Sequence, residues 1–207
     1  MIFASLPVGL IQTNCYVVGC EETKEGAVID PGGHPERILA EVERHGLAIK
    51  YVLDTHAHFD HTDANGAIVQ ATGASLALHP EDRPLLEASG GAALFGMHAV
   101  PSPPPDLELH DGDEIQVGTL VFKVLHTPGH TPGHVCFYEA DEEVVFDGDV
   151  LFYRGIGRTD LPGGSWQQLL ESIQGVLFAL PDNTIVYSGH GPATTIGEEK
   201  RLNPWLR

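Results

Sequence analysis

Four potential metal ligands lie within six residues, in the string THAHFDH at residues 55–61: His56, His58, Asp60 and His61. Imidazole nitrogens and carboxylate oxygens are ligands for zinc, iron or manganese. Residues two apart in an extended turn point the same way, so the first two histidines can share one ion while Asp60 and His61 turn toward a second. A solvated loop is the alternative, but burying four such groups without metal would leave several polar atoms without partners.

Three further ligand candidates stand alone, each beside a glycine and each at the end of an apolar segment. They are His130 in TPGHTPGH, Asp149 in FDGDVLF and His190 in YSGHGP. Glycine lets the backbone approach a site closely. With the first four residues they complete a set that suits two ions sharing a carboxylate and a hydroxide. A single structural zinc needs about four ligands and has no open position.

Short apolar segments precede most of these residues, as expected if strands deliver them to one site. In the first half, the pattern predicts strands at residues 15–18, 27–29, 49–53 and 75–78, with helices at residues 35–46, 64–71 and 80–88. In the second half, it predicts strands at residues 114–117, 120–125, 135–138, 143–146 and 184–187. Ser165 and Gln168 form a capping-box pattern for a long helix that ends before Pro181.

Strands followed by helices occur in both halves of the chain. This pattern predicts an α/β fold in which two sheets pack face to face with helices outside, a four-layer sandwich. The length of 207 residues and the hydrophobic content of 42% favour one globular domain over residues 1–207. Residues 90–105, rich in Gly, Ala and Pro, predict a linker or lid.

The chain carries 11 Lys plus Arg against 29 Asp plus Glu, a net charge of −18. This balance argues against a nucleic-acid or anionic-membrane surface, which would be basic. The first 20 residues have no basic n-region, so neither a signal peptide nor a membrane helix is expected. Three cysteines cannot all pair, which favours a reducing, cytoplasmic location. Cys15 and Cys20 should face opposite sides of one sheet.

With these motifs in order, the chain resembles the metallo-β-lactamase superfamily, and within it the short, single-domain bacterial glyoxalase II (hydroxyacylglutathione hydrolase) branch. Asp30 in VIDPGG and the GRTDLP and GHGPATTIGEEKRLNPW stretches share in the resemblance. The resemblance implies the αβ/βα sandwich of that superfamily. It also implies that Asp30 orients a ligand histidine.

The same resemblance implies a binuclear centre of two divalent ions, zinc in the first place, with iron or manganese as alternatives. One ion would be bound by His56, His58 and His130, the other by Asp60, His61 and His190, and Asp149 would bridge both. His134 also lies in TPGHTPGH and competes with His130 for the ligand role. The family pattern assigns His130, which leaves His134 in a supporting position.

The implied activity is hydrolysis of a small-molecule thioester, S-lactoylglutathione or a related hydroxyacylglutathione, by a hydroxide that bridges the two ions. Asp60 and Asp149 would hold that hydroxide as well as the metal, as catalytic carboxylates. Two-domain relatives grip glutathione with a helical domain, which is not expected after the short tail that follows His190. Phe152, Tyr153 and Arg154 directly follow Asp149 and are candidates for the pocket wall, where a cation would suit an anionic substrate.

Other residues are weaker candidates for the site. Arg158 and Asp160 in GRTD are interpreted as a mutual ion pair rather than a substrate contact. His79 and His126 adjoin predicted strand ends and could approach the pocket.

Other activities stay open at this point. A persulfide dioxygenase shares the HxHxDH string and the RGxGRTD stretch, and would use His56, His130 and Asp149 to hold one iron. Lactones or other esters are alternative substrates, and the metal site could instead be regulatory or structural. A nuclease is disfavoured by the charge of −18. The oligomeric state is left open by the sequence.

Overall fold

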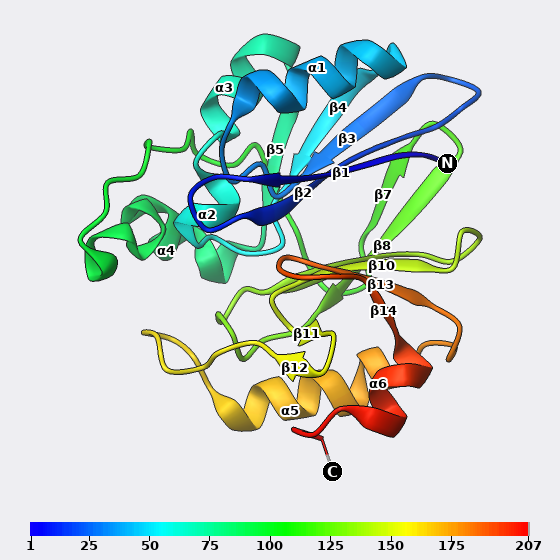
Figure 1. Cartoon of the computed structure of the whole chain (residues 1–207). Helices are drawn as coiled ribbons and strands as arrows, with labels where there is room; N and C mark the ends of the chain where they lie inside the picture. Colours follow the sequence, from blue (N-terminus) through cyan, green and yellow to red (C-terminus); the bar gives the residue numbers. More distant parts are fainter. Residues whose placement is uncertain (207) are drawn as a thin grey trace.

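The computed structural model describes residues 1–206, which form four layers in the order helices, sheet, sheet, helices (Figure 1). Helices α1 (Pro35–His45) and α3 (Asn65–Thr72) cover the outer face of the first sheet. Helices α5 (Trp166–Gly175) and α6 (Ile196–Leu202) cover the outer face of the second. The predicted αβ/βα sandwich is confirmed.

The first sheet has the strand order β1-β2-β3-β4-β5-β6. Its strands are β1 (Ile2–Val8), β2 (Thr13–Gly19), β3 (Glu25–Ile29), β4 (Ala48–Leu53), β5 (Ser75–Leu78) and β6 (Leu107–Glu108). The first three pair antiparallel, and the strands from β3 to β6 pair parallel. Parallel neighbours need a crossover connection, which α1 and α3 provide.

The second sheet has the order β14-β13-β10-β9-β8-β7. Its strands are β7 (Glu114–Val117), β8 (Leu120–His126), β9 (Val135–Glu139), β10 (Val144–Gly148), β13 (Ile185–Ser188) and β14 (Thr194–Thr195). Only β10 and β13 pair parallel in this sheet, and α5 lies between them in the chain. A separate ribbon pairs β11 (Leu151–Phe152) with β12 (Gly155–Ile156).

Sequence signals at the helix ends explain where the long helices begin and end. Helix α1 begins at Pro35, whose ring fixes a helical φ, and ends before Gly46, which has φ 64°. The Ser165 side chain caps α5 by accepting the Gln168 amide, as the capping-box pattern predicts. The helix predicted to continue toward Pro181 instead ends at Gly175, and a 3₁₀ turn, η3 (Leu177–Ala179), follows.

The main core lies between the two sheets and is centred on Phe122, Phe137 and Phe146, all fully buried. Alternation along β2 sends neighbouring side chains to opposite layers. Cys15 therefore packs under the helices of the first sheet, whereas Cys20 belongs to the core between the sheets. This confirms that the two cysteines face opposite sides.

The segment predicted as a linker or lid is partly built into the fold. Its start forms a 3₁₀ element, η2 (Ser89–Phe95), after α4 (Arg83–Glu87), and Gly90 lies so close to Phe59 that a Cβ there would collide with the Phe59 backbone. Farther on, the Val100 amide donates to Asp63, and Ser102 accepts a hydrogen bond from Asn65. These contacts fasten the segment to Asp63 and to the first residue of α3, so it is a fixed connection.

Several short elements were not predicted from the sequence: β1, β6, β11, β12, β14 and α6. Most are edge or two-residue strands, in which hydrophobic alternation is too brief to be recognised. Within residues 1–206, no helix is both long and apolar enough to cross a membrane.

Candidate metal centre

The seven candidate ligands follow the ends of four strands, one in the first sheet and three in the second. Strand β4 leads into the THAHFDH loop and the short helix α2 (Phe59–Thr62), and β8 leads into the loop that carries His130. Asp149 directly follows β10, and His190 lies two residues beyond β13. Because the two sheets pack face to face, these loops meet at one edge of the sandwich (Figure 1).

His56, His58 and His130 form the first group, with ligand atoms within 4.8 Å of one another. The Nδ1 atom of His58 lies 2.9 Å from the Nε2 atom of His130. The other ring nitrogen of His130, Nδ1, donates to the Arg158 carbonyl oxygen at 2.7 Å. A hydrogen bond of this kind leaves Nε2 with its lone pair toward the site, which is how ligand histidines are usually held.

Asp60, His61 and His190 form the second group. The Oδ2 atom of Asp60 lies 3.2 Å from His190 Nε2 and 3.6 Å from His61 Nε2. The same oxygen accepts a hydrogen bond of 2.9 Å from the hydroxyl of Thr13, at the start of β2. Thr13 was not recognised from the sequence, because a lone threonine 47 residues from Asp60 carries no signal.

Asp149 lies between the two groups. Its Oδ1 is 3.6 Å from His61 Nε2, and its Oδ2 is 3.6 Å from His130 Nε2 and 3.7 Å from His190 Nε2. One carboxylate therefore faces both groups. The approach depends on Gly189, where a Cβ would collide with the Asp149 carboxylate and the His61 ring.

Three buried ligand atoms have no hydrogen-bond partner: His56 Nε2, His61 Nε2 and Asp149 Oδ1. Burying an unpaired polar atom costs about 1–3 kcal/mol, so three in one place need a compensating partner. All three belong to ligand groups whose atoms lie within 4.8 Å of one another. This donor set fits divalent metal ions.

Asp30 fixes the orientation of two ligand histidines. Its Oδ2 accepts from His61 Nδ1 at 2.9 Å and from the Thr55 hydroxyl at 2.7 Å. That hydroxyl in turn lies 3.1 Å from His56 Nδ1, so it can accept the ring proton while it donates to Asp30. Asp30 thus turns the Nε2 atoms of both rings toward the site. The sequence analysis expected one histidine to be held in this way.

Burial and neighbouring charges shift the pKa values of His58 and His61 in opposite directions. Burial, followed by the nearby His130, lowers the pKa of His58 to about 3. Burial also opposes charge on His61, but the surrounding carboxylates, Asp60 first, raise its pKa to about 10. His61 is therefore protonated at neutral pH without metal, and metal binding at its Nε2 must release that proton.

His134 is held away from any ligand role. It is fully buried, its Nε2 accepts the Asp149 amide at 3.1 Å, and its Nδ1 lies 3.1 Å from the Thr127 hydroxyl. Both ring nitrogens are therefore used, and the ring supports the backbone of Asp149. This geometry favours His130 as the ligand from TPGHTPGH.

Replacing His134 by alanine is expected to keep the metal content at saturating metal close to that of the wild type. The same substitution should lower the free energy of unfolding by about 2–4 kcal/mol, because it leaves a cavity and an unpaired Asp149 amide. Metal analysis and urea unfolding measure the two effects. Loss of one ion at saturating metal would show that His134, rather than His130, is the ligand.

Asp82, another residue that was not recognised from the sequence, joins the two loops of the first group. It lies in η1 (Pro80–Asp82) and is fully buried. Its carboxylate accepts from the Ala57 amide, the Thr131 hydroxyl and the Gly133 amide at 2.7–3.0 Å. Asp82 therefore holds the chain between His56 and His58 against the chain on either side of Pro132.

A cavity of about 370 Å³ opens in front of the centre. Ligand residues line one side, and Ile11, Phe59, Phe95, Phe152, Ile156 and Leu161 supply apolar walls. Arg158 is the one arginine or lysine among the described residues that line it. As predicted, its guanidinium pairs with Asp160, at 2.7 and 2.8 Å, yet the side chain stays half exposed at the cavity.

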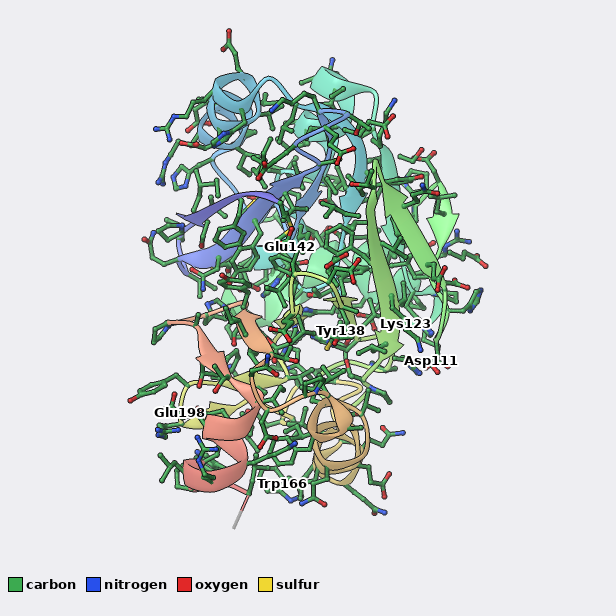
Figure 2. All side chains as sticks on the ribbon, turned by 90° about the vertical axis from the view of Figure 1, so that its right-hand side faces the viewer. Asp111, Lys123, Tyr138, Glu142, Trp166 and Glu198 are labelled. Atoms are coloured by element: carbon green, nitrogen blue, oxygen red, sulfur yellow. The ribbon has the colours of Figure 1, made fainter. Side chains whose placement is uncertain are left out.

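The prediction that Arg154 lines the pocket is wrong. Its guanidinium pairs with Glu198 at 2.6 Å and with the buried Glu199 at 2.9 Å, both on α6 (Figure 2 labels Glu198). Tyr153 does not line the cavity either, and its ring packs against the Arg154 guanidinium at 4.8 Å. Arg154 therefore ties α6 to the β11–β12 turn, while Phe152 alone of the three reaches the cavity.

The model of the metallo-beta-lactamase superfamily matches residues 8–190, which include every candidate ligand. The chain is 41% identical to "Hydroxyacylglutathione hydrolase GloC" of Haemophilus influenzae, over 97% of this chain and 96% of that protein. It is 32% identical to "Persulfide dioxygenase ETHE1, mitochondrial" of Mus musculus, over 94% of this chain and 71% of that protein.

Two solved structures share the fold over nearly their whole length. The BLEG-1 B3 metallo-beta-lactamase is 43% identical with a TM-score of 0.93, covering 99% of each chain. TTHA1623, solved in a di-iron-bound form, is 42% identical with a TM-score of 0.90, covering 98% of this chain and 100% of its own.

Proposed function

The chain belongs to the metallo-beta-lactamase superfamily, and we propose that it is a binuclear metal-dependent thioesterase acting on S-lactoylglutathione or a related hydroxyacylglutathione. The observation that carries this proposal is Asp149, whose carboxylate faces both ligand groups beside an open cavity. The likeness to the GloC hydrolase supports the choice of thioester. Zinc is the proposed metal, with iron or manganese as alternatives.

In this proposal, each group of side chains has a defined task. His56, His58 and His130 would hold one ion, Asp60, His61 and His190 the other, and Asp149 both. When bound, such a pair of ions lowers the pKa of a shared water and polarises a carbonyl, which is the chemistry that ester hydrolysis needs. Asp60 and Asp149 supply the carboxylate oxygens that orient this water.

The cavity supplies a place for the rest of the substrate. Its apolar side chains exclude water from the thioester, and Arg158 offers a positive charge at its rim. Glutathione carries carboxylates, and the chain has a net charge of −18, so a cation at the rim offsets repulsion of an anionic substrate. Arg158 holds His130 through its backbone carbonyl, whereas its guanidinium pairs with the exposed Asp160, so a substrate carboxylate would share the guanidinium with Asp160.

Replacing Arg158 by glutamine is expected to raise KM for S-lactoylglutathione about fivefold and leave kcat within about twofold, because a half-exposed charge contributes about 1 kcal/mol to binding. The Arg158 carbonyl remains in place, so metal content should not change. An uncharged thioester is the matched substrate, and its kinetics should be unaffected. An equal loss with both substrates would contradict a charge-specific role.

The test of the proposed function is thiol release from S-lactoylglutathione by purified protein of known metal content. A His58→Ala variant sets the background rate. Release by the wild type well above that background supports the thioesterase. No release from fully metallated protein would overturn the proposal. Hydrolysis of lactones and β-lactams, which frees no thiol and is followed by acid release or absorbance, would then identify the ester or amide that the centre accepts.

The likeness to the persulfide dioxygenase favours one second candidate, a mononuclear iron enzyme using His56, His130 and Asp149. Iron content does not separate the two functions, because a hydrolase can also bind iron. Measuring oxygen uptake in the presence of glutathione persulfide separates the dioxygenase from the hydrolase. Uptake at a rate matching product formation would establish the oxidoreductase in place of the hydrolase.

The protein's location and partners follow from the same reasoning. We propose a cytoplasmic enzyme of one domain with a small-molecule substrate and neither nucleic acid nor membrane as partner. Cys15, Cys20 and Cys136 are free and buried, as suits a reducing compartment.

A further inference from the structure

A second group of potential metal ligands lies outside the centre described above. His79, Glu81 and His126 offer ligand atoms within 4.8 Å of one another. His79 follows β5 of the first sheet, Glu81 lies in η1, and His126 ends β8 of the second sheet. His79 and His126 were weak candidates for the pocket, and none of the three residues lines the cavity.

Three imidazole rings gather at this point. The rings of His79 and His126 stack with centroids 4.3 Å apart, and His110 meets the His79 ring edge-on at 6.0 Å. Asp111, labelled in Figure 2, accepts the His126 amide at 2.9 Å and so holds the end of β8. Stacked imidazoles and a nearby carboxylate make a donor set that suits zinc-like divalent ions.

The ring of His126 forms a hydrogen bond through Nε2, which leaves Nδ1 as the nitrogen that could bind an ion. Its Nε2 lies 2.9 Å from the Pro132 carbonyl oxygen, which can only accept, so Nε2 carries the ring proton. The Nδ1 lone pair is therefore free. A ligand histidine that donates its second nitrogen to a backbone carbonyl is the usual arrangement around protein-bound metals.

His79 is suited to the same ion. The residue is 6% exposed, and its ring lies against that of His126. Its Nδ1 accepts the Glu81 amide over 3.3 Å, a long hydrogen bond that metal binding can replace. Glu81 and His110 are exposed and free to rotate inward.

The geometry requires only a local adjustment. Donor atoms on one tetrahedral zinc lie roughly 3.4 Å apart, given bonds of about 2.1 Å. The three donors lie within 4.8 Å, so rotation about the side-chain torsions must close roughly 1.4 Å and turn the stacked rings so that their lone pairs converge.

We propose that His79, Glu81 and His126 bind one zinc-like divalent ion that clips the two sheets together, with His110 or water completing its shell. The ion would crosslink the end of β5 to the end of β8, close to Asp82 and Pro132, which lie in the segments around the metal centre. His79 is three residues from Asp82, and His126 holds Pro132, between His130 and His134. The ion would therefore stiffen the loop that carries His130 without touching the substrate.

The test compares zinc content after equilibrium dialysis of metal-free protein against about 1 µM free zinc. The wild type should retain one ion more per chain than His79→Gln or His126→Gln. His45→Gln, on α1 and outside both clusters, is the matched control and should retain as many ions as the wild type. Equal zinc content in all four proteins would overturn the proposal.

A second readout uses unfolding temperature and needs no activity. In an Asp149→Ala background, which impairs the main centre, zinc should still raise Tm by several degrees. Adding Glu81→Gln, a change at an exposed position that should not disturb folding, is expected to weaken zinc binding about tenfold and shrink that rise. A zinc-induced rise that is unchanged by Glu81→Gln would contradict the clip.

Discussion

Replacing Asp149 by alanine is expected to reduce thioester hydrolysis at least about 10³-fold and to lower the number of bound metal ions. Among the described residues, Asp149 is the one carboxylate that faces both ligand groups, at 3.6–3.7 Å from His61, His130 and His190. Its loss removes a shared negative charge, so the remaining histidines must hold two cations with Asp60 alone. Metal analysis and the thiol-release assay measure the two effects together.

The matched control for this prediction is Asp182→Ala. Asp182 is an exposed carboxylate that pairs with Lys200 on α6 and belongs to neither ligand group. Its removal takes away the same charge from the protein but should leave metal content and turnover unchanged. Full turnover and two ions in Asp149→Ala would remove the bridging assignment.

Replacing Asp30 by asparagine is expected to weaken metal binding about 10–100-fold, the usual effect of losing a group that orients ligand histidines. Asparagine has nearly the same shape but lacks the charge. It has one acceptor oxygen, whereas Asp30 uses both of its oxygens: Oδ1 accepts from the Thr55 amide, and Oδ2 accepts from His61 Nδ1 and the Thr55 hydroxyl. The rings of His61 and His56 then lose their fixed orientation. Competition with a chelator of known affinity measures the change.

Comparison with Thr55→Val separates the effect of Asp30 on His56, which acts through the Thr55 hydroxyl, from its direct effect on His61. Valine keeps the volume of threonine but cannot link His56 Nδ1 to Asp30. It should therefore weaken metal binding less than Asp30→Asn, because His61 keeps its carboxylate. Excess metal should restore most of the turnover of both variants. Wild-type metal affinity in Asp30→Asn would show that the packing around the rings, rather than this carboxylate, sets their orientation.

The helix and strand positions near the centre were largely predictable. Strands β2, β3, β4, β5, β7, β8, β9, β10 and β13 lie where alternating or continuous apolar runs indicate them, and the ends of α1 and the start of α5 follow from Pro35, Gly46 and Ser165. These signals are local. Weak two-residue strands such as β6 and β14 form only because a neighbouring strand offers hydrogen bonds, so no local pattern could predict them.

Arg154 and Arg158 show that proximity in sequence to Asp149 does not decide which side chain lines the cavity. Arg154 is close in sequence to Asp149, and this proximity favoured it for the cavity wall. In the fold, β11 and β12 form a tight ribbon, and Arg154 at its turn meets Glu198 and Glu199 from a helix more than 40 residues away. Arg158, four residues later, is returned to the cavity rim by the same ribbon.

HxHxDH and the glycine-flanked His130, Asp149 and His190 are local features of composition and spacing, so the candidate ligands and the strand ends that carry them could be predicted from the sequence. The groups that support these residues depend on the tertiary fold. Thr13 reaches Asp60, Asp82 joins Ala57 to Thr131, and His126 meets His79 through the packing of distant segments. The physical reason is that a side chain's partners depend on which sheets face each other, and that is set by burial of the whole core between them.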